Sequence, residues 1–584
     1  MSNSHTKTTN ATLIKADWSD WKFIVGITML VLVIATIPYL YAYYTAPPDE
    51  VYMGVMINVP DHGQYFSWMR ELTYGYLSAN KLTSEPNKPV FFNLLWFMLG
   101  RLDGVLGIGF DGAFQLLRIV STILFLLMIY RLCTWYFDDL FMRRTAFLII
   151  TFTSGFGWFL IVIKYIMGTT GPPYPLLVFA AEGNTFFSMM ASPHFIGAAL
   201  YIFVFDIILV GQSKEGQNWT FDVFKTTKIF DILKQYRYAI IAGVVALFFG
   251  WQHAYDLVLV YGILGIFGML VLIRDRKIPW HLLLSGIILA LISWWPALYS
   301  VILTSLDPMW EEVLAQFANA DVFTPALPYI PILMGITFIL ALLTAIADNP
   351  FRLVGRSDLE LFLIAWFWGN FLLLYIPTDF QIHMFNGWQV PIGILATQGL
   401  FKHVVPYIQQ HATKQNWQRS AERIRLAVVV IFIILIIPTN VYLFLWRFID
   451  SGRYTYPLYF HQDDMSAMAW LETNGNSDDV VLSSIETSTF IPAYTGKHVF
   501  LAHWAQTIDY FNKHDMVMEF FNHETSDERR HDILQTYSVD YLFFGPAERS
   551  IGDYNPQHSS FLEVVYELPK VTIYQVNTYE YELH

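Results

Sequence analysis

The chain has 584 residues, of which 55% are hydrophobic and 14% are charged, and its formal net charge at pH 7 is −13. Soluble domains carry roughly 25% charged residues, so this composition excludes a protein that lies wholly in water. The negative charge argues against a nucleic-acid partner, because phosphates repel an acidic protein. The single cysteine, Cys133, excludes an intrachain disulfide.

Long apolar runs predict an α-helical polytopic membrane protein with about eleven transmembrane helices. A bilayer needs about 20 apolar residues for each helical span. A polar segment at 1–21 comes first, and no small-residue cleavage site follows the first apolar run, so we expect that span to be retained. The predicted spans are 22–44, 112–135, 145–166, 193–211, 238–252, 255–273, 281–303, 327–346, 359–376, 388–406 and 424–446.

The positive residues predict the orientation of these spans. Lys and Arg gather in alternate connections, whereas the loops 167–192, 304–326 and 377–387 have none. Positive residues stay on the cytoplasmic side, so the N-terminus is expected inside the plasma membrane and the C-terminal tail outside it. The only Asn-x-Ser/Thr sequons, at Asn10 and Asn218, fall on the inner side, which favours a prokaryotic membrane.

The predicted outer loop 45–111 carries the first candidate residue. Its prolines break it into short helices, of which Pro89–Leu106 is expected to lie along the membrane interface. Another helix is expected to start near Asn58, with Pro60 in its first turn and Asp61 favoured at its positive end. Helical spacing then places three further side chains on the face of Asp61: Tyr65, Trp68 and Leu72.

Two interpretations of Asp61 remain open at this point. The spacing Asn58-x-x-Asp61 is that of a capping box, which would make the acid structural. However, a carboxylate followed by His62, Tyr65, Trp68 and Arg70 at a membrane surface also suits sugar chemistry. The pair Asp49-Glu50 is a rival for the same role, or an ordinary solvated turn after Pro47-Pro48.

Two further outer positions carry candidate binding residues. Glu182 closes one loop, and His194 stands at the mouth of the next span, where it contacts either a phosphate or only the membrane interface. His253 and Asp256 lie in the connection between two predicted spans. Ionisable residues at membrane depth are costly and therefore suggest function, although a tight interhelical turn is the alternative.

The loop 379–391 is the last candidate in the membrane region. It combines His383 and Trp388 with several amides and has little hydrophobic periodicity. Either it forms part of a substrate site or it is an aromatic belt at the start of a span.

After Arg447 the composition becomes that of a soluble protein. Helix-like and strand-like pieces alternate, which predicts a C-terminal extracytoplasmic α/β domain at 447–584, beyond a transmembrane domain at 22–446. The expected pieces are Met465–Thr473, Val480–Ser483, Val499–Ala502, Ile508–Asn522, Asp527–Tyr537, Tyr541–Gly545 and Val564–Gln575.

The layout resembles the multi-span glycosyltransferases of the GT-C fold class, in particular the protein mannosyltransferase and aminoarabinose transferase branches. The resemblance rests on Asp61 after the first span, the large first outer loop and the outward soluble tail. Three tail segments also resemble the tails of uncharacterised bacterial members: Ala469-Trp470-Leu471, Ile491-Pro492-Ala493-Tyr494-Thr495-Gly496 and Tyr541-Leu542-Phe543-Phe544-Gly545.

The resemblance implies a GT-C-like fold and transfer of a sugar from a polyprenyl-phosphate donor on the outer face. The acceptor is a glycan, a lipid or a protein, and the displacement inverts the sugar, with an acid of the first loop as base. By position that base is Asp61. The sequence departs from the family in having Asp61-His62 where two adjacent acids are usual, so Asp49-Glu50 remains a rival site. Some relatives use a divalent metal, and none is predicted here.

The departing lipid phosphate needs cationic or N–H partners, and aromatic rings can stack on sugar faces. The candidates for phosphate are Arg70, His194, His253 and His383, and those for stacking are Tyr65, Trp68 and Trp388. The main alternative is a transporter or flippase of a lipid-linked or sugar substrate, which would place paired charges in mid-span. Such charges are sparse, with Asp206 as one exception. An assembly subunit with a recruiting tail is a third possibility.

Overall fold

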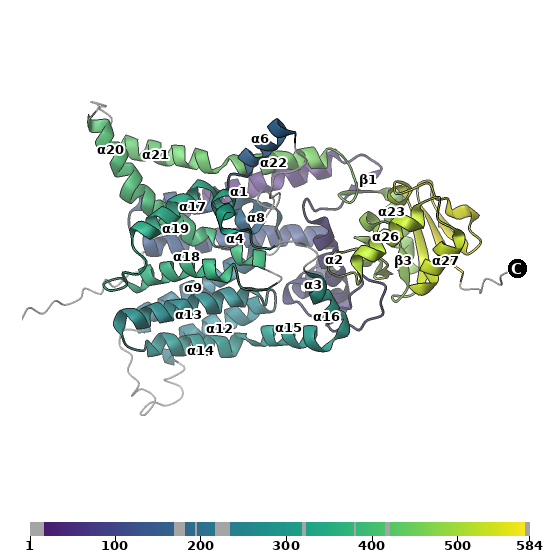
Figure 1. Cartoon of the computed structure of the whole chain (residues 1–584), viewed down its shortest axis with the longest axis horizontal. Helices are drawn as coiled ribbons and strands as arrows, with labels where there is room; N and C mark the ends of the chain where they lie inside the picture. Colours follow the sequence, from purple (N-terminus) through teal and green to yellow (C-terminus); the bar gives the residue numbers. More distant parts are fainter. Residues whose placement is uncertain are drawn as a thin grey trace, which may run out of the picture. The chain divides into compact units, whose positions relative to one another are not determined.

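The computed structural model describes residues 17–168, 181–192, 195–215, 234–317, 323–378, 381–414 and 421–577. The chain divides into two compact units (Figure 1). Unit 1 consists of Met1–Thr36, Leu117–Leu298 and Val322–Trp446, and unit 2 of Ile37–Leu116, Tyr299–Asp321 and Arg447–His584.

Long apolar helices dominate unit 1. Among the described residues, six helical segments are long and apolar enough to cross a membrane, and the number rises to eight if each of two bent pairs is one span. The single segments are Trp18–Thr45 (α1), Gly109–Tyr136 (α4), Leu140–Met167 (α5, Leu140–Phe152, and α6, Gly157–Met167), Phe195–Lys214 (within α9, Phe195–Glu215), Asp256–Asp275 (α13) and Leu327–Ala347 (η4, Leu327–Tyr329, and α17, Ile330–Ala347). The bent pairs are α14 (Trp280–Ser293) with α15 (Trp295–Leu306), and α21 (Ala421–Ile436) with α22 (Pro438–Ser451).

The predicted polytopic helical architecture is therefore confirmed, while the count of eleven spans remains a prediction. Three predicted spans correspond to shorter helices. These are α12 (Arg237–Gly250), α18 (Asp358–Leu373) and α19 (Gln389–Gly399), of which the last continues through a π-helical turn, η6 (Leu400–Val404), into α20 (Val405–Lys414). Apolar composition does not reveal such changes of backbone geometry, because they depend on local packing.

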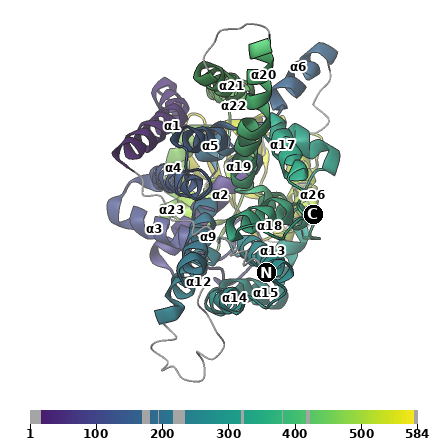
Figure 2. The same ribbon diagram turned by 90° about the vertical axis from the view of Figure 1, so that its left-hand side faces the viewer.

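The helices of unit 1 pack in a bundle. Helix α12 packs against α14 and α9, α13 against α18, and α17 against α19, as Figure 2 shows with the helices seen end on. Short elements connect them at one end of the bundle: η1 (Ala181–Gly183), α8 (Thr185–Ala191) and η5 (Gln381–Phe385). Two ion pairs lie within the bundle. Arg143 Nη1 lies 3.0 Å from Asp20 Oδ2, and Arg131 Nε lies 3.0 Å from Asp206 Oδ1.

Unit 2 contains a five-stranded mixed sheet in the order β4-β3-β5-β7-β6. Strands β3, β4 and β5 are parallel, and β7 runs antiparallel to β5 and β6. The strands are β3 (Val480–Leu482), β4 (His498–Val499), β5 (Val539–Phe544), β6 (Leu562–Glu567) and β7 (Thr572–Val576). The helices around them are α23 (Gln462–Thr473), α24 (Ile485–Ser488), α25 (Ile491–Thr495), α26 (Tyr510–Phe521), α27 (Asp527–Thr536), α28 (Pro546–Arg549) and η7 (Pro556–His558).

The α/β character predicted for the tail is thus confirmed. One detail differs, because the piece expected at 564–575 is the hairpin of β6 and β7. The run Val564–Gln575 contains Pro569, which falls between the two strands, where a turn tolerates the missing N–H.

The loop 45–111 belongs to the same unit as the tail. Strand β1 (Glu50–Tyr52) pairs antiparallel with β2 (Tyr459–His461), and the loop also supplies α2 (Val59–Tyr74) and α3 (Leu94–Leu106). The segment 81–83 lies beside β4 and the residues after it. The Val499 amide donates to the Lys81 carbonyl at 3.1 Å, and Thr83 forms an antiparallel bridge with Leu501. The third stretch of unit 2, Tyr299–Asp321, contains α16 (Pro308–Ala315).

A buried lysine ties this loop to the tail. Lys513 on α26 is completely buried, and its ammonium donates to Glu85 Oε1 at 2.6 Å and to Ser84 Oγ at 2.8 Å. Burial lowers the pKa of Lys513, while the Glu85 carboxylate opposes that shift. The loop and the tail therefore share one core although they are more than 400 residues apart in the chain.

Candidate active site

Asp61 lies in the first turn of α2, as its sequence context predicts. Asn58 is the N-cap residue, but its backbone is left-handed, with φ 49° and ψ 49°, and its side chain makes no capping hydrogen bond. The first-turn N–H groups give this end of the helix partial positive charge, which favours a carboxylate there. The side chain of Asp61 is 28% exposed, so a substrate can reach it.

The partner of Asp61 is a histidine that sequence reasoning missed. His503 Nε2 lies 2.9 Å from Asp61 Oδ1, and the His503 side chain is 3% exposed. His503 follows the β4 edge of the sheet, and the carboxyl ends of parallel strands are common sites for functional residues. The sequence did contain a signal for His503. A strand was expected at Val499–Ala502, and His503 is the first residue after it.

The surroundings of His503 fix which of its nitrogens carries the proton. Its Nδ1 accepts the backbone N–H of Ala505 at 3.1 Å and that of Gln506 at 3.4 Å. A neutral imidazole that accepts at Nδ1 has its proton on Nε2. The His503 Nε2–H therefore donates to Asp61 Oδ1, and a buried imidazole holds an accessible carboxylate in one orientation.

The aromatic residues predicted beside Asp61 pack within the protein. The Tyr65 ring stacks on Trp96, with centroids 4.3 Å apart and 12° between the planes. Trp68 packs against Phe91, with ring centroids 4.3 Å apart, and Tyr65 and Trp68 are 8% and 7% exposed. Sugar stacking by Tyr65 and Trp68 remains a prediction, and this packing does not favour it.

His62 and Arg70 are also engaged by the protein. The buried His62 Nδ1 lies 3.0 Å from the Asn58 carbonyl, and desolvation lowers the pKa of His62, so the ring is neutral at pH 7. Arg70 pairs with Glu472 at 2.8 Å and donates to the Tyr494 carbonyl at 3.1 Å. Arg70 thus connects α2 to α23 and α25.

The rival acid pair lies on the β1–β2 ribbon of the same unit. Asp49 pairs with Lys570 at 2.8 Å, and this hydrogen bond lowers the pKa of the Asp49 carboxyl. Burial raises the pKa of Glu50. Asp49 also lies 3.7 Å from His461 Nδ1, but the His461 side chain is 19% exposed, whereas that of His503 beside Asp61 is 3% exposed.

In unit 1 the structure brings together three separate groups of predicted residues. His383 Nδ1 on η5 lies 3.2 Å from Glu182 Oε1 on η1. The ring of Tyr255 stacks on His383 at 4.8 Å and on His253 at 5.4 Å. We call Glu182, His253, Tyr255, Asp256 and His383 the bundle-end cluster.

The members of the bundle-end cluster differ in accessibility. His383 and Glu182 have side chains 22% and 19% exposed, whereas those of His253 and Asp256 are 3% and 0% exposed. Asp256 Oδ2 lies 3.4 Å from His253 Nδ1. A side chain at Gly197 would come within 2.7 Å of Asp256 Oδ2, so the glycine lets α9 approach this carboxylate.

The remaining predicted residues are a buried tryptophan and a residue that lies outside the described part of the chain. Trp388 is 0% exposed, and its indole N–H donates to the Phe367 carbonyl at 3.1 Å. His194 lies outside the described residues. Within the described ranges no group of three or more His, Cys, Asp or Glu side chains is suited to hold a metal ion. Asp61 and His503 alone do not fit the divalent metal that some relatives use.

Comparisons with known proteins identify the class of fold. No protein-family model matches the sequence, and no curated protein matches it significantly. Among solved structures, the chain matches the archaeal oligosaccharyltransferase AglB from Archaeoglobus fulgidus, in complex with an inhibitory peptide and a dolichol-phosphate. The TM-score is 0.56 and the identity 11%, over 91% of this chain and 70% of that chain.

A second match is the arabinofuranosyltransferase AftD from Mycobacteria, with a TM-score of 0.52 and 12% identity over 94% of this chain. This chain covers only 40% of AftD. The structure thus matches the GT-C fold of membrane glycosyltransferases, which confirms the resemblance seen in the sequence. Identities this low show the fold alone.

Proposed function

We propose that the protein transfers a sugar from a polyprenyl-phosphate donor to an acceptor, with Asp61 as the general base. The observation that carries this proposal is the Asp61–His503 pair, in which an accessible carboxylate at a helix start is oriented by a buried imidazole. The GT-C fold supports lipid-linked sugar transfer as the class of reaction.

The proposed reaction is one direct displacement at the anomeric carbon. The acceptor hydroxyl oxygen forms the new bond while the bond from the anomeric carbon to the phosphate oxygen breaks, and that electron pair leaves on the lipid phosphate. A hydroxyl is a weak nucleophile, so Asp61 accepts its proton as the bond forms. The attack comes from the face opposite the phosphate, and the sugar is inverted.

His503 is a positioning residue in this scheme. Its N–H holds Asp61 Oδ1 at 2.9 Å and so helps to keep the carboxylate in one orientation. Because the ring accepts two backbone N–H groups at Nδ1, it cannot turn without losing them.

The bundle-end cluster is proposed to bind the polar group of a lipid-linked substrate. His383 is the most accessible histidine of the cluster. When its Nδ1 carries a proton, the Glu182 carboxylate, 3.2 Å away, accepts a hydrogen bond from that N–H and orients the ring. In support, AglB was solved with a dolichol-phosphate, a lipid of the proposed class. AglB was also solved with a tethered acceptor peptide, and a protein acceptor is one of the three proposed classes, with glycan and lipid.

The site is proposed to face outward from the plasma membrane. This placement rests on the Lys and Arg pattern, which assigns the N-terminus and unit 1 turns such as 274–277 to the cytoplasm. The tail and the first outer loop then lie outside together.

The test is transfer by the purified full-length protein in lipid nanodiscs, with radiolabelled sugar on a short polyprenyl phosphate. A panel of sugars and acceptors is needed, and mass spectrometry of envelope glycans from cells with and without the protein selects it. We expect one glycan to lose a sugar without the protein and the same sugar to be transferred in vitro. Unchanged glycans, together with movement of intact lipid-linked sugar across the bilayer, would instead identify a flippase.

A further inference from the structure

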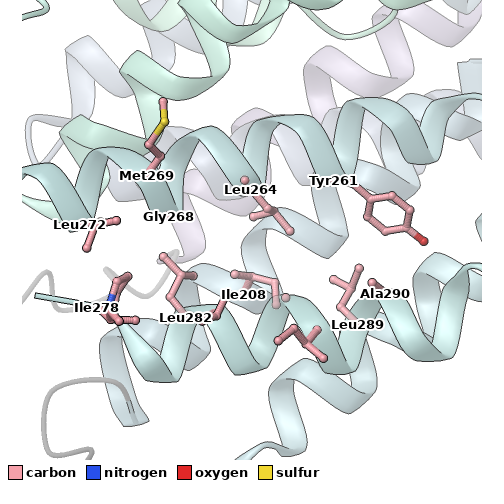
Figure 3. Close-up of a pocket in the computed structure, with 15 residues that line it drawn as sticks. Ile208, Tyr261, Leu264, Gly268, Met269, Leu272, Ile278, Leu282, Leu289 and Ala290 are labelled. Atoms are coloured by element: carbon pink, nitrogen blue, oxygen red, sulfur yellow. The ribbon is translucent and has the colours of Figure 1, made fainter.

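An apolar groove in unit 1 shares no lining residue with the bundle-end cluster. It has a volume of about 390 Å³ and runs between α13 and α14, with Ile208 of α9 at its floor. Figure 3 shows side chains of α13, such as Leu264, and of α14, such as Leu282, on the two sides of this space. Tyr261 supplies the one hydroxyl at the groove, and that hydroxyl lies 2.8 Å from Ser293 Oγ.

Glycines create the groove. Gly265, Gly268 and Gly286 line it, and a Cβ at Gly265 or Gly286 would meet no atom within 4 Å. Glycine in a helix interior is less favourable than alanine, so three glycines along one groove lower helix stability and leave space there. The rim residues Met269 and Leu283 are exposed, as expected of side chains that face lipid tails.

The size of the groove suits a hydrocarbon chain. A cavity of ~150 Å³ holds one benzene ring, so 390 Å³ takes roughly fifteen carbon atoms. The groove follows α13 from Tyr261 to Leu272, and the eleven steps between these residues make about 16 Å of helix at 1.5 Å per step. A single acyl chain has these dimensions.

Two positively charged residues lie next to one end of the groove and would suit the anionic head group of a lipid. Ile278 and Pro279 line that end, and Arg276 and Lys277, which directly precede them, are both exposed. The neighbouring Arg274 is occupied by Asp275 and by Asp358 at 2.7 Å. Trp280 follows at the start of α14, a position typical of the membrane interface.

We propose that this groove binds one anionic phospholipid of the cytoplasmic leaflet. Its acyl chain lies between α13 and α14, and its phosphate contacts Arg276 and Lys277. The turn 275–279 falls on the side that the Lys and Arg pattern assigns to the cytoplasm, where anionic lipids attract basic residues. Since the proposed sugar donor is used on the outer face, the occupant is a membrane phospholipid and not that donor.

The test is quantitative lipid mass spectrometry of the full-length protein after extensive detergent exchange. We expect one retained phosphatidylglycerol per chain when the protein is incubated with equal amounts of phosphatidylglycerol and phosphatidylcholine. The variant Gly286→Leu fills the groove and is expected to retain none. Its matched control is Gly26→Leu on α1, where a Cβ also meets nothing within 4 Å, and which should retain the lipid.

The head-group contact is tested with Arg276→Gln/Lys277→Gln against Arg352→Gln, an exposed arginine of another turn. Loss of two charges near an anionic head group is expected to weaken phosphatidylglycerol binding roughly thirtyfold. Equal retention by Gly286→Leu and Gly26→Leu would overturn the proposal, as would retention of phosphatidylcholine or a polyprenyl phosphate in place of phosphatidylglycerol.

Discussion

Asp61 in unit 2 and Asp256 in unit 1 are both acids beside a histidine, yet their environments differ. Asp61 is 28% exposed and accepts from His503 at 2.9 Å, whereas Asp256 is fully buried and lies 3.4 Å from His253. A general base must reach the proton that it accepts. The greater accessibility of Asp61 therefore favours Asp61 over Asp256 as the proposed base.

The largest expected effect separates these two acids. Asp61→Asn removes the proton acceptor with little change of shape, and the turnover of sugar transfer should fall roughly a hundredfold to ten-thousandfold. Asp256→Asn should keep turnover within about tenfold, because neutralising a buried carboxylate that lacks a hydrogen bond relieves a desolvation cost. Steady-state kinetics with labelled donor measure both. Equal losses in the two variants would remove the distinction.

The next effect tests the positioning role of His503. His503→Ala leaves Asp61 in place but removes its hydrogen bond, and turnover should fall about tenfold to a hundredfold. The Michaelis constant for the acceptor should stay unchanged. His503→Gln retains an N–H donor and should recover part of the rate. A purely structural role would instead lower the melting temperature of both variants without this partial recovery.

A smaller effect is expected in the bundle-end cluster. His383→Ala should raise the Michaelis constant for the lipid-linked donor about tenfold while turnover changes little, since a lost hydrogen bond to a charged group weakens binding by that order. Glu182→Gln, which loses the charge facing His383, should act in the same direction. If His383→Ala instead lowered turnover and left the Michaelis constant for the donor unchanged, the hypothesis that this cluster binds the phosphate would be wrong.

The smallest expected effect is a pH dependence of stability in unit 2. Burial raises the pKa of Asp464 on α23 to about 6, above its ordinary value of 3.8. The folded protein therefore binds this proton more tightly than the unfolded chain, and stability should decrease as pH rises from about 4 to about 6. Asp464→Asn should flatten this part of the melting-temperature profile, and the exposed Asp515→Asn should not.

Local signals predicted much of this molecule from the sequence. The apolar runs located α1, α4 and α13, and alternating patterns located α23, β3 and β5. The helix start at Asn58 was correct because Pro60 and Asp61 act within one turn. Such features depend on neighbours in the chain, which a single sequence displays.

Long-range contacts could not be predicted in the same way. His503 contacts Asp61 across 442 residues of the chain, and Lys513 binds Glu85 across 428 residues. The sequence also did not show that Tyr65 packs on Trp96 of α3 and Trp68 on Phe91. An aromatic side chain has the same local pattern whether its partner is a sugar or another ring, so only the fold distinguishes them.

The most direct test of the account is chemical rescue of the proposed base. Asp61→Ala and His503→Ala are each assayed for sugar transfer with and without formate, a small carboxylate that can occupy the space of the missing side chain. The account predicts that formate restores transfer to Asp61→Ala and leaves His503→Ala unchanged. Full transfer by Asp61→Ala in the absence of formate would contradict it.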